Sequence, residues 1–194
     1  MAHLLLVPLA YLIGSVPSGY LLGKSAGVDV RSVGSGNIGA TNVARSLGKL
    51  GGAVTLIADA AKGFLPVYVA LQLDSTAVIV ALTAMAAFLG HIYPVYLHFR
   101  GGKGVATAFG ALLALAPMAT LVLIVLFVVV VLCTRLASLG SIITAVAAPV
   151  VLWVFNQPTV IVGLGLFFAA MVLIRHRGNI QRLLAGTEPR FGSH

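Results

Sequence analysis

The sequence has little charge and few residues of the kinds that bind metals. Only 8% of its 194 residues are charged, against about 25% in a typical soluble domain. The one cysteine, Cys133, lies in an apolar run, which excludes a disulfide framework and a cysteine metal site. The four acidic residues are far apart along the chain, at Asp29, Asp59, Asp74 and Glu188. No acidic cluster could hold Mg²⁺ against a diphosphate, which argues against a CDP-alcohol phosphotransferase type of enzyme, and we expect neither a metal nor a cofactor.

Apolar residues fill most of the chain. They make up 60% of it, and the mean hydropathy is +1.09. This composition predicts an all-α, polytopic integral membrane protein, with residues 1–194 forming one membrane-embedded domain. Because a helix needs about 20 apolar residues to cross a bilayer, we expect clear spans near residues 4–23, 52–71, 77–99, 136–155 and 159–174.

The stretch Val105–Cys133 has no charged residue and carries Pro117 near its middle. It could form one tilted helix or a tight pair of short helices. Only the pair places all the basic stretches between spans on one side: Lys24–Lys49, Arg100–Lys103, Arg135 and Arg175–Arg190. The positive-inside rule favours this second interpretation. It predicts seven transmembrane helices, some of them short, with the N-terminus outside and the C-terminus in the cytoplasm.

The net charge of +8 would suggest a nucleic-acid partner in a soluble protein. Here the basic residues flank the spans, so we expect contact with anionic membrane lipid and no nucleic-acid partner. Asp59 and Lys62 lie within a predicted span, three residues apart and so on one helix face. They either form an ion pair that fixes helix packing, or Lys62 lines the edge of an anion site.

Two short motifs resemble nucleotide-binding signatures. Gly34–Gly39 matches the G-x-G-x-x-G pattern of dinucleotide-binding folds, with Asp59 twenty residues beyond it. That pattern requires a strand before it and a helix after it, whereas these residues lie in a loop between membrane spans. Ser18–Ser25 resembles a Walker A sequence without its first glycine, but it lies at the end of a membrane helix. We reject both interpretations.

The glycine-rich stretches have the parts of anion sites, because glycine lets backbone amides turn onto an anion and a basic side chain neutralises it. Gly101, Gly102 and Gly104 surround Lys103 directly before a predicted helix, whose N-terminus suits a phosphate. The first stretch offers Ser35, Asn37, Thr41, Asn42 and Arg45. Our hypothesis is that the two stretches hold two phosphates, with charge from Arg45 and Lys103 and a further hydrogen bond from Ser141.

Four segments together resemble the bacterial acyl-phosphate:glycerol-3-phosphate acyltransferases, and the resemblance covers the whole chain. They are Ser15–Tyr20, Gly34–Arg45, Gly90–Gly104 and Arg175–Ile180. The resemblance implies that an acyl group moves from acyl phosphate to the 1-hydroxyl of glycerol 3-phosphate. The products are lysophosphatidic acid and inorganic phosphate, in the first step of phospholipid synthesis. It places the site at the cytoplasmic face of the bacterial inner membrane, and we expect no cofactor and no obligate protein partner.

The resemblance also implies roles for His176 and Asn179 near the reacting hydroxyl and carbonyl. The His-x-x-x-x-Asp dyad of another acyltransferase class is absent from the sequence. Either His176 or the leaving phosphate could take the proton, and the lack of a carboxylate near His176 in the sequence favours the phosphate. Two rival functions are an anion or organophosphate transporter and a non-catalytic lipid-binding scaffold. The uncharged outer turns argue against the first, and the specific polar loop residues argue against the second.

Overall fold

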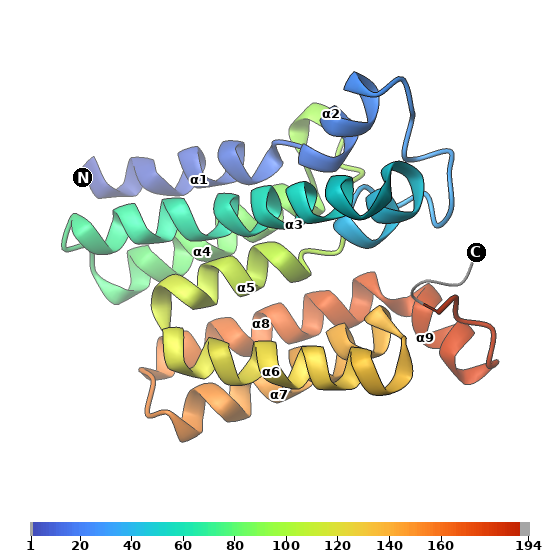
Figure 1. Ribbon diagram of the computed structural model, residues 1–194. Helices are drawn as coiled ribbons and strands as arrows, with labels where there is room; N and C mark the ends of the chain where they lie inside the picture. Colours follow the sequence, from blue (N-terminus) through green and yellow to red (C-terminus); the bar gives the residue numbers. More distant parts are fainter. Residues whose placement is uncertain (1, 191–194) are drawn as a thin grey trace. The chain divides into compact units, whose positions relative to one another are not determined.

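Every regular element in the part of the chain that the structure describes, residues 2–190, is a helix (Figure 1). The structure is a computed structural model. Its internal contacts divide the chain after Ala114 into an N-terminal unit and a C-terminal unit. The predicted all-helical membrane architecture is confirmed, while the prediction of one domain over residues 1–194 stays a prediction.

The N-terminal unit carries two short 3-10 helices and five α-helices. In chain order they are η1 (Ala2–Leu5), α1 (Leu6–Ser15), α2 (Ser18–Ser25), α3 (Ala40–Gln72), α4 (Ala77–Ile92), η2 (Val95–Leu97) and α5 (Val105–Leu115). The C-terminal unit consists of α6 (Pro117–Thr134), α7 (Ala137–Val154), α8 (Thr159–Arg175) and α9 (Arg177–Leu184). We call residues 26–39, between α2 and α3, the first loop, and residues 98–104, between η2 and α5, the second loop.

Helices with the length and composition of membrane spans occur where the hydropathy predicts them. Within residues 2–190, five are long and apolar enough, and the bent pair of α8 and α9 makes a possible sixth. The five are His3–Ser25, Ala40–Gln72, Ala77–Leu97, Pro117–Thr134 and Ala137–Val154. The stretch Val105–Cys133 forms two helices that part at Ala116, because Pro117 begins α6 and cannot continue the hydrogen-bond ladder of α5. The shorter of the two, α5, has 11 residues, and the total of seven spans stays a prediction.

Glycines bring the helices of the N-terminal unit into close contact. A Cβ atom at Gly14 of α1 would overlap the backbone of Ala87 in α4, and one at Gly90 of α4 would overlap the carbonyl of Tyr11 in α1. Helix α5 meets α3 in the same way, since a Cβ at Gly63 would overlap the backbone of Thr107. Small residues hold membrane helices together by letting their backbones approach.

Breaks in two of these helices shape the ends that face the loops. The first predicted span is interrupted at Val16 and Pro17, between α1 and α2. Helix α3 is kinked at Gly48, whose φ of 79° departs from the helical range. The predicted span over residues 52–71 lies after this kink, and a shorter helical segment before the kink carries Thr41 and Arg45.

The C-terminal unit packs α7 against both α6 and α8. Gly165 of α8 lies against Leu152 and Pro149 of α7, which fill the space that a side chain would need. Helix α9 leaves the axis of α8 at an angle of 63°. His176 stands at this bend, as the last residue before α9 begins.

The close contact of α1 and α4 predicts a large effect of one methyl group. We expect Gly90→Ala to destabilise the protein by about 1–3 kcal/mol, because the new carbon overlaps backbone that cannot yield easily. Gly163→Ala is the matched control, since nothing lies within 4 Å of its Cβ position and alanine favours a helix by up to about 1 kcal/mol. Thermal unfolding in detergent should therefore give a lowered midpoint for the first variant alone. Equal midpoints would contradict the packing of these helices.

Candidate functional site

The buried amide of Asn42 organises the first loop. Its Oδ1 atom accepts a hydrogen bond from the backbone amide of Ser35 at 2.8 Å, and its Nδ2 atom donates to the carbonyls of Val30 at 2.8 Å and Val33 at 3.0 Å. Asn42 is only 2% exposed. Gly34 has a φ of 59°, and a Cβ there would overlap Asn42 Oδ1. One side chain at the start of α3 therefore sets the path of the loop that carries Ser35.

The first loop brings several of the predicted phosphate-binding residues close to the start of α3. Asn37 Oδ1 accepts from the amide of Gly39 at 2.9 Å, so this side chain shapes the turn into the helix. Thr41 and Arg45 follow one helical turn apart and so share a face of α3. The Arg45 side chain passes within 3.9 Å of the Cβ position of Gly34. Polar groups and one cation therefore gather around this turn, and their binding of a phosphate stays a prediction.

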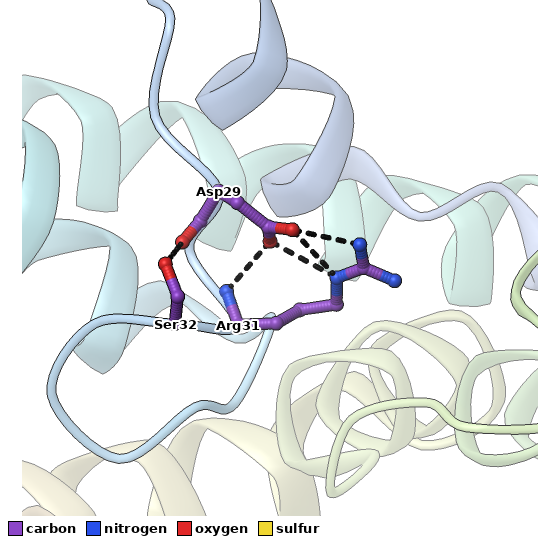
Figure 2. A network of polar contacts seen from close by, with 3 residues as sticks. All are labelled: Asp29, Arg31 and Ser32. Carbon is purple, nitrogen blue, oxygen red and sulfur yellow. Dashed lines mark hydrogen bonds and ion pairs between the residues drawn. The ribbon is translucent and has the colours of Figure 1, made fainter.

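A second cation, Arg31, ties the start of the first loop to α2. Figure 2 shows its guanidinium and its amide bonded to the carboxylate of Asp29, while Ser32 Oγ donates to the Asp29 carbonyl at 2.8 Å. The guanidinium also lies 4.5 Å from the ring centroid of Tyr20, a cation–π contact. The hydrogen bonds from Arg31 lower the pKa of Asp29 to about 2. The pair is therefore intact above pH 4 and is lost only as the pH falls toward 2.

The second loop lies closely against the end of α4. The amides of Gly101 and Gly102 donate to the carbonyls of Ile92 and His91, each at 3.1 Å. A Cβ at Gly102 would overlap His91 Nε2, and Gly104 has a φ of 82°. Each glycine thus has a packing or backbone reason to be there. The prediction that Gly101, Gly102 and Gly104 contact a phosphate stays a prediction, and two of their amides already donate within the protein.

Lys103 stands at the junction of this loop with a helix. Its side chain is half-buried, and α5 begins two residues later at Val105. The amides of the first helical turn have no partner within the helix and carry partial positive charge. A cation and a helix N-terminus thus occur together, which is the combination that the sequence predicts for a phosphate.

A buried ion pair lies behind the second loop. Lys62 Nζ is 2.9 Å from Asp59 Oδ1, and these side chains are only 6% and 3% exposed. Lys62 Nζ also donates to the Val16 carbonyl at 2.8 Å, at the break between α1 and α2. His91 Nδ1 lies 3.7 Å from the same carboxylate oxygen. The Nε2 atom of the same ring lies against Gly102. Of the two interpretations of Asp59 and Lys62, the structure therefore shows the internal ion pair.

In the C-terminal unit, His176 is only 2% exposed and its ring orientation is set by the end of α8. Its Nδ1 atom lies 2.8 Å from the Val172 carbonyl oxygen. Because a carbonyl can only accept, Nδ1 must carry the proton. In the neutral ring, Nε2 is then the basic nitrogen.

Asn179, one turn into α9, is held by a carboxylate that sequence reasoning did not connect with it. Asn179 Nδ2 donates to Glu188 Oε1 at 2.6 Å, and Ser138 Oγ donates to the same oxygen at 2.7 Å. Arg182 Nε donates to Glu188 Oε2 at 2.8 Å. Burial alone would raise the pKa of Glu188, but these hydrogen bonds outweigh it and lower the pKa below its usual 4.5. The carboxylate is therefore ionised at neutral pH, and its contribution to stability is lost only below its usual pKa.

Ser141 lies one turn after Ser138 at the start of α7, and its hydroxyl donates to the Ala137 carbonyl at 2.9 Å. The predicted site residues thus fall into both units. The N-terminal unit holds Ser35, Asn37, Thr41, Arg45, Gly101, Gly102, Lys103 and Gly104, and the C-terminal unit holds Ser141, His176 and Asn179. Among residues 2–190, no group of three or more histidine, cysteine, aspartate and glutamate side chains could hold a metal ion.

The buried ion pair predicts an asymmetric response to mutation. Lys62→Met alone leaves the Asp59 carboxylate buried without its cation, and such losses cost about 3–5 kcal/mol. Adding Asp59→Asn removes the stranded charge, so the double variant should recover at least half of that loss. The midpoints of thermal unfolding in detergent measure both effects. A double variant that is less stable than Lys62→Met would contradict the pairing.

The chain matches known proteins over nearly its whole length. A sequence model of the glycerol-3-phosphate acyltransferase family matches residues 4–186. A glycerol-3-phosphate acyltransferase from Geobacter metallireducens is 52% identical over 191 residues, covering 98% of each chain. One from Geobacter sulfurreducens is 48% identical over 189 residues, covering 97% of each.

Solved structures give the same result. The crystal structure of PlsY, an integral membrane glycerol 3-phosphate acyltransferase, in its glycerol 3-phosphate form superposes with a TM-score of 0.96 at 41% identity. The lysophosphatidic acid form of PlsY superposes with a TM-score of 0.93 at 40% identity. Each comparison covers 99% of this chain and 96% of the other. The apolar helices, the basic glycine-rich loops and these matches together show that the chain belongs to the glycerol-3-phosphate acyltransferase family of integral membrane enzymes.

Proposed function

We propose that this glycerol-3-phosphate acyltransferase takes its acyl group from acyl phosphate and releases lysophosphatidic acid and inorganic phosphate. The observation that supports the acceptor and the acylated product is the pair of ligand forms in which PlsY was solved, glycerol 3-phosphate and lysophosphatidic acid. These two molecules differ by one acyl group on the glycerol. They are therefore the acceptor and the product of a single acylation, which is the first step of phospholipid synthesis.

An acyl phosphate donor fits the chemistry of the described side chains. Both substrates then carry a phosphate, and the N-terminal unit offers two cations, Arg45 at the start of α3 and Lys103 in the second loop. His176 Nδ1 is bonded to a backbone carbonyl, which leaves Nε2 able to accept a hydrogen bond from a hydroxyl. A donor that is already activated has less need of a strong base. Positioning and charge stabilisation could then supply most of the rate.

The reaction that follows from this assignment needs no covalent enzyme intermediate. The 1-hydroxyl oxygen of glycerol 3-phosphate attacks the acyl carbonyl carbon, and the bond from that carbon to the phosphate oxygen breaks. The departing phosphate takes the hydroxyl proton, so that charge and atoms balance. His176 Nε2 accepts a hydrogen bond from the hydroxyl and orients it, and Asn179 binds the glycerol of glycerol 3-phosphate beside it. The phosphates are bound by Ser35, Asn37, Thr41, Arg45, Gly101, Gly102, Lys103, Gly104 and Ser141.

We also propose a sidedness for the protein in the bacterial inner membrane. All but one of the twelve Lys and Arg residues lie in the four stretches between predicted spans, and cytoplasmic loops are the ones that collect such residues. Counting α5 and the bent α8–α9 pair as spans then gives seven. The N-terminus lies outside, and the first and second loops face the cytoplasm.

An assay with purified protein in detergent tests the proposed function directly. We expect inorganic phosphate and lysophosphatidic acid in a 1:1 ratio from acyl phosphate, and only when glycerol 3-phosphate is present. A transporter or a non-catalytic lipid-binding scaffold would release no phosphate. Equal or faster acylation from acyl-CoA would contradict the assigned donor while leaving the family's activity intact.

The sidedness predicts the labelling of single cysteines in a Cys133→Ser background. In intact cells, an impermeant maleimide should react with Asp74→Cys and Gln157→Cys, and it should spare Gly178→Cys until the membrane is opened. The first two positions lie in turns between helices, and the third lies at the start of α9. Labelling of the cysteine at 178 but not of the one at 74 would reverse the assignment.

The proposed proton transfer predicts the effect of His176→Gln. If His176 only orients the acceptor hydroxyl, this variant should raise the KM for glycerol 3-phosphate about tenfold, in line with one lost hydrogen bond. If His176 were the general base, kcat would fall by about 10²–10⁴-fold and the acid limb of its pH profile would disappear. Steady-state kinetics between pH 5 and 9 separate these cases. A loss in kcat above about a thousandfold with unchanged KM would show that the histidine is the base.

A further inference from the structure

The Glu188 carboxylate lies where the chain folds back after α9. Gly186, with a φ of 70°, turns the chain, and the amide of Thr187 donates to the Arg182 carbonyl at 2.9 Å. The Glu188 side chain is consequently only 8% exposed. It gathers side-chain donors from two helices, with Ser138 on α7 and both Asn179 and Arg182 on α9. A carboxylate with three such partners is neither a solvated surface group nor an isolated buried charge.

The two oxygens of Glu188 serve different partners. Oε1 accepts from Asn179 Nδ2 and from Ser138 Oγ, at 2.6 and 2.7 Å. Oε2 accepts from Arg182 Nε, whose side chain is 42% exposed. The contact with Asn179 is thus the interior one, since Asn179 is only 7% exposed. The contact with Arg182 lies at the surface.

An ionised carboxylate can only accept hydrogen bonds, whereas the two ends of an asparagine amide have opposite polarity. The nitrogen of Asn179 must therefore face Glu188, and its Oδ1 must face the other way. The carboxylate thus decides which end of the amide points away from it. Reversing this end would replace an acceptor by a donor without moving any backbone atom.

We propose that Glu188 is a positioning residue for the acyl transfer, which fixes the Asn179 amide with its oxygen toward the 2-hydroxyl of glycerol 3-phosphate. The inference rests on the proposed role of Asn179 in binding that substrate. The hydrogen of the attacking 1-hydroxyl is directed at His176 Nε2 and passes to the departing phosphate, so the 2-hydroxyl is the glycerol hydroxyl that still needs an acceptor. An amide oxygen held in place supplies that acceptor and so positions the glycerol, whereas an amide nitrogen in its place could not accept the hydrogen.

Glu188→Gln tests this assignment while keeping the size of the side chain. If the glutamine keeps its oxygen toward Asn179, its NH₂ group faces Arg182 Nε. Two hydrogen-bond donors then face each other, which is unfavourable. The flipped glutamine presents its NH₂ group to Asn179, whose amide must then turn over. We expect kcat/KM for glycerol 3-phosphate to fall roughly ten- to a hundredfold, the range for a lost hydrogen bond to a charged group. The KM for glycerol 3-phosphate should rise, and the KM for acyl phosphate should stay within about twofold of wild type.

Arg182→Gln is the matched control, because it breaks the surface contact of the same carboxylate and leaves the oxygen bonded to Asn179. We expect its kcat/KM to stay within about threefold of wild type, because both hydrogen bonds to Glu188 Oε1 remain in place. If Glu188 served only to fasten α9, both variants would lose active enzyme without a change in either KM. Glu188→Asp keeps an acceptor-only group and should retain more activity than Glu188→Gln. It also provides the comparison if the glutamine variant does not fold.

A double-mutant cycle shows whether Glu188 acts through Asn179. If it does, Glu188→Gln combined with Asn179→Ala should be no slower than Asn179→Ala alone, and the same holds for Glu188→Asp. Losses that multiply, or a Glu188→Gln variant within threefold of wild type, would overturn the inference. If Asn179→Ala is impaired while Glu188→Gln is not, the proposed role of Asn179 stands and the inference about Glu188 fails. Full activity of Asn179→Ala would overturn both.

Discussion

The packing of the N-terminal unit depends on one ion pair that is buried away from water. Asp59 and Lys62 meet within residues 52–71 of α3, which contain no other charged residue, and removing either charge would leave the other buried without its partner. Lys62 also fills the hydrogen-bonding need of the carbonyl exposed where α1 and α2 part. His91 lies beside the same carboxylate and contacts Gly102. Three helical segments and the second loop thus depend on where this pair is placed.

The two glycine-rich loops look alike in sequence and use glycine for different physical reasons. In the first loop, Gly34 and Gly36 have positive φ values of 59° and 67°, which bring the chain around the Asn42 side chain. In the second loop, Gly101 and Gly102 lie against α4 so closely that a Cβ would overlap His91. Glycine is needed in the first loop because the backbone has a positive φ there. It is needed in the second loop because α4 leaves no space for a Cβ atom.

The features that can be predicted from this sequence are those that depend on a single residue or on one periodic pattern. Runs of apolar residues locate the helices, Pro117 marks a helix start, and a spacing of three predicts the pairing of Asp59 with Lys62. Sequence reasoning does not work where contacts join distant segments. Nothing in the sequence connects Glu188 with Ser138, fifty positions earlier, and no periodicity predicts that Asn42 rather than a glycine amide holds Ser35.

His176 and Asn179 are three residues apart, yet their orientations are inherited from different parts of the chain. The ring of His176 and its own amide both bond to the carbonyl of Val172, within a single turn. This contact of the histidine ring is local to the end of α8. The amide of Asn179 is bonded instead to Glu188, a residue beyond the end of α9. Changes in the chain after α9 would therefore reach the Asn179 amide directly, so drift in that segment could retune acceptor recognition.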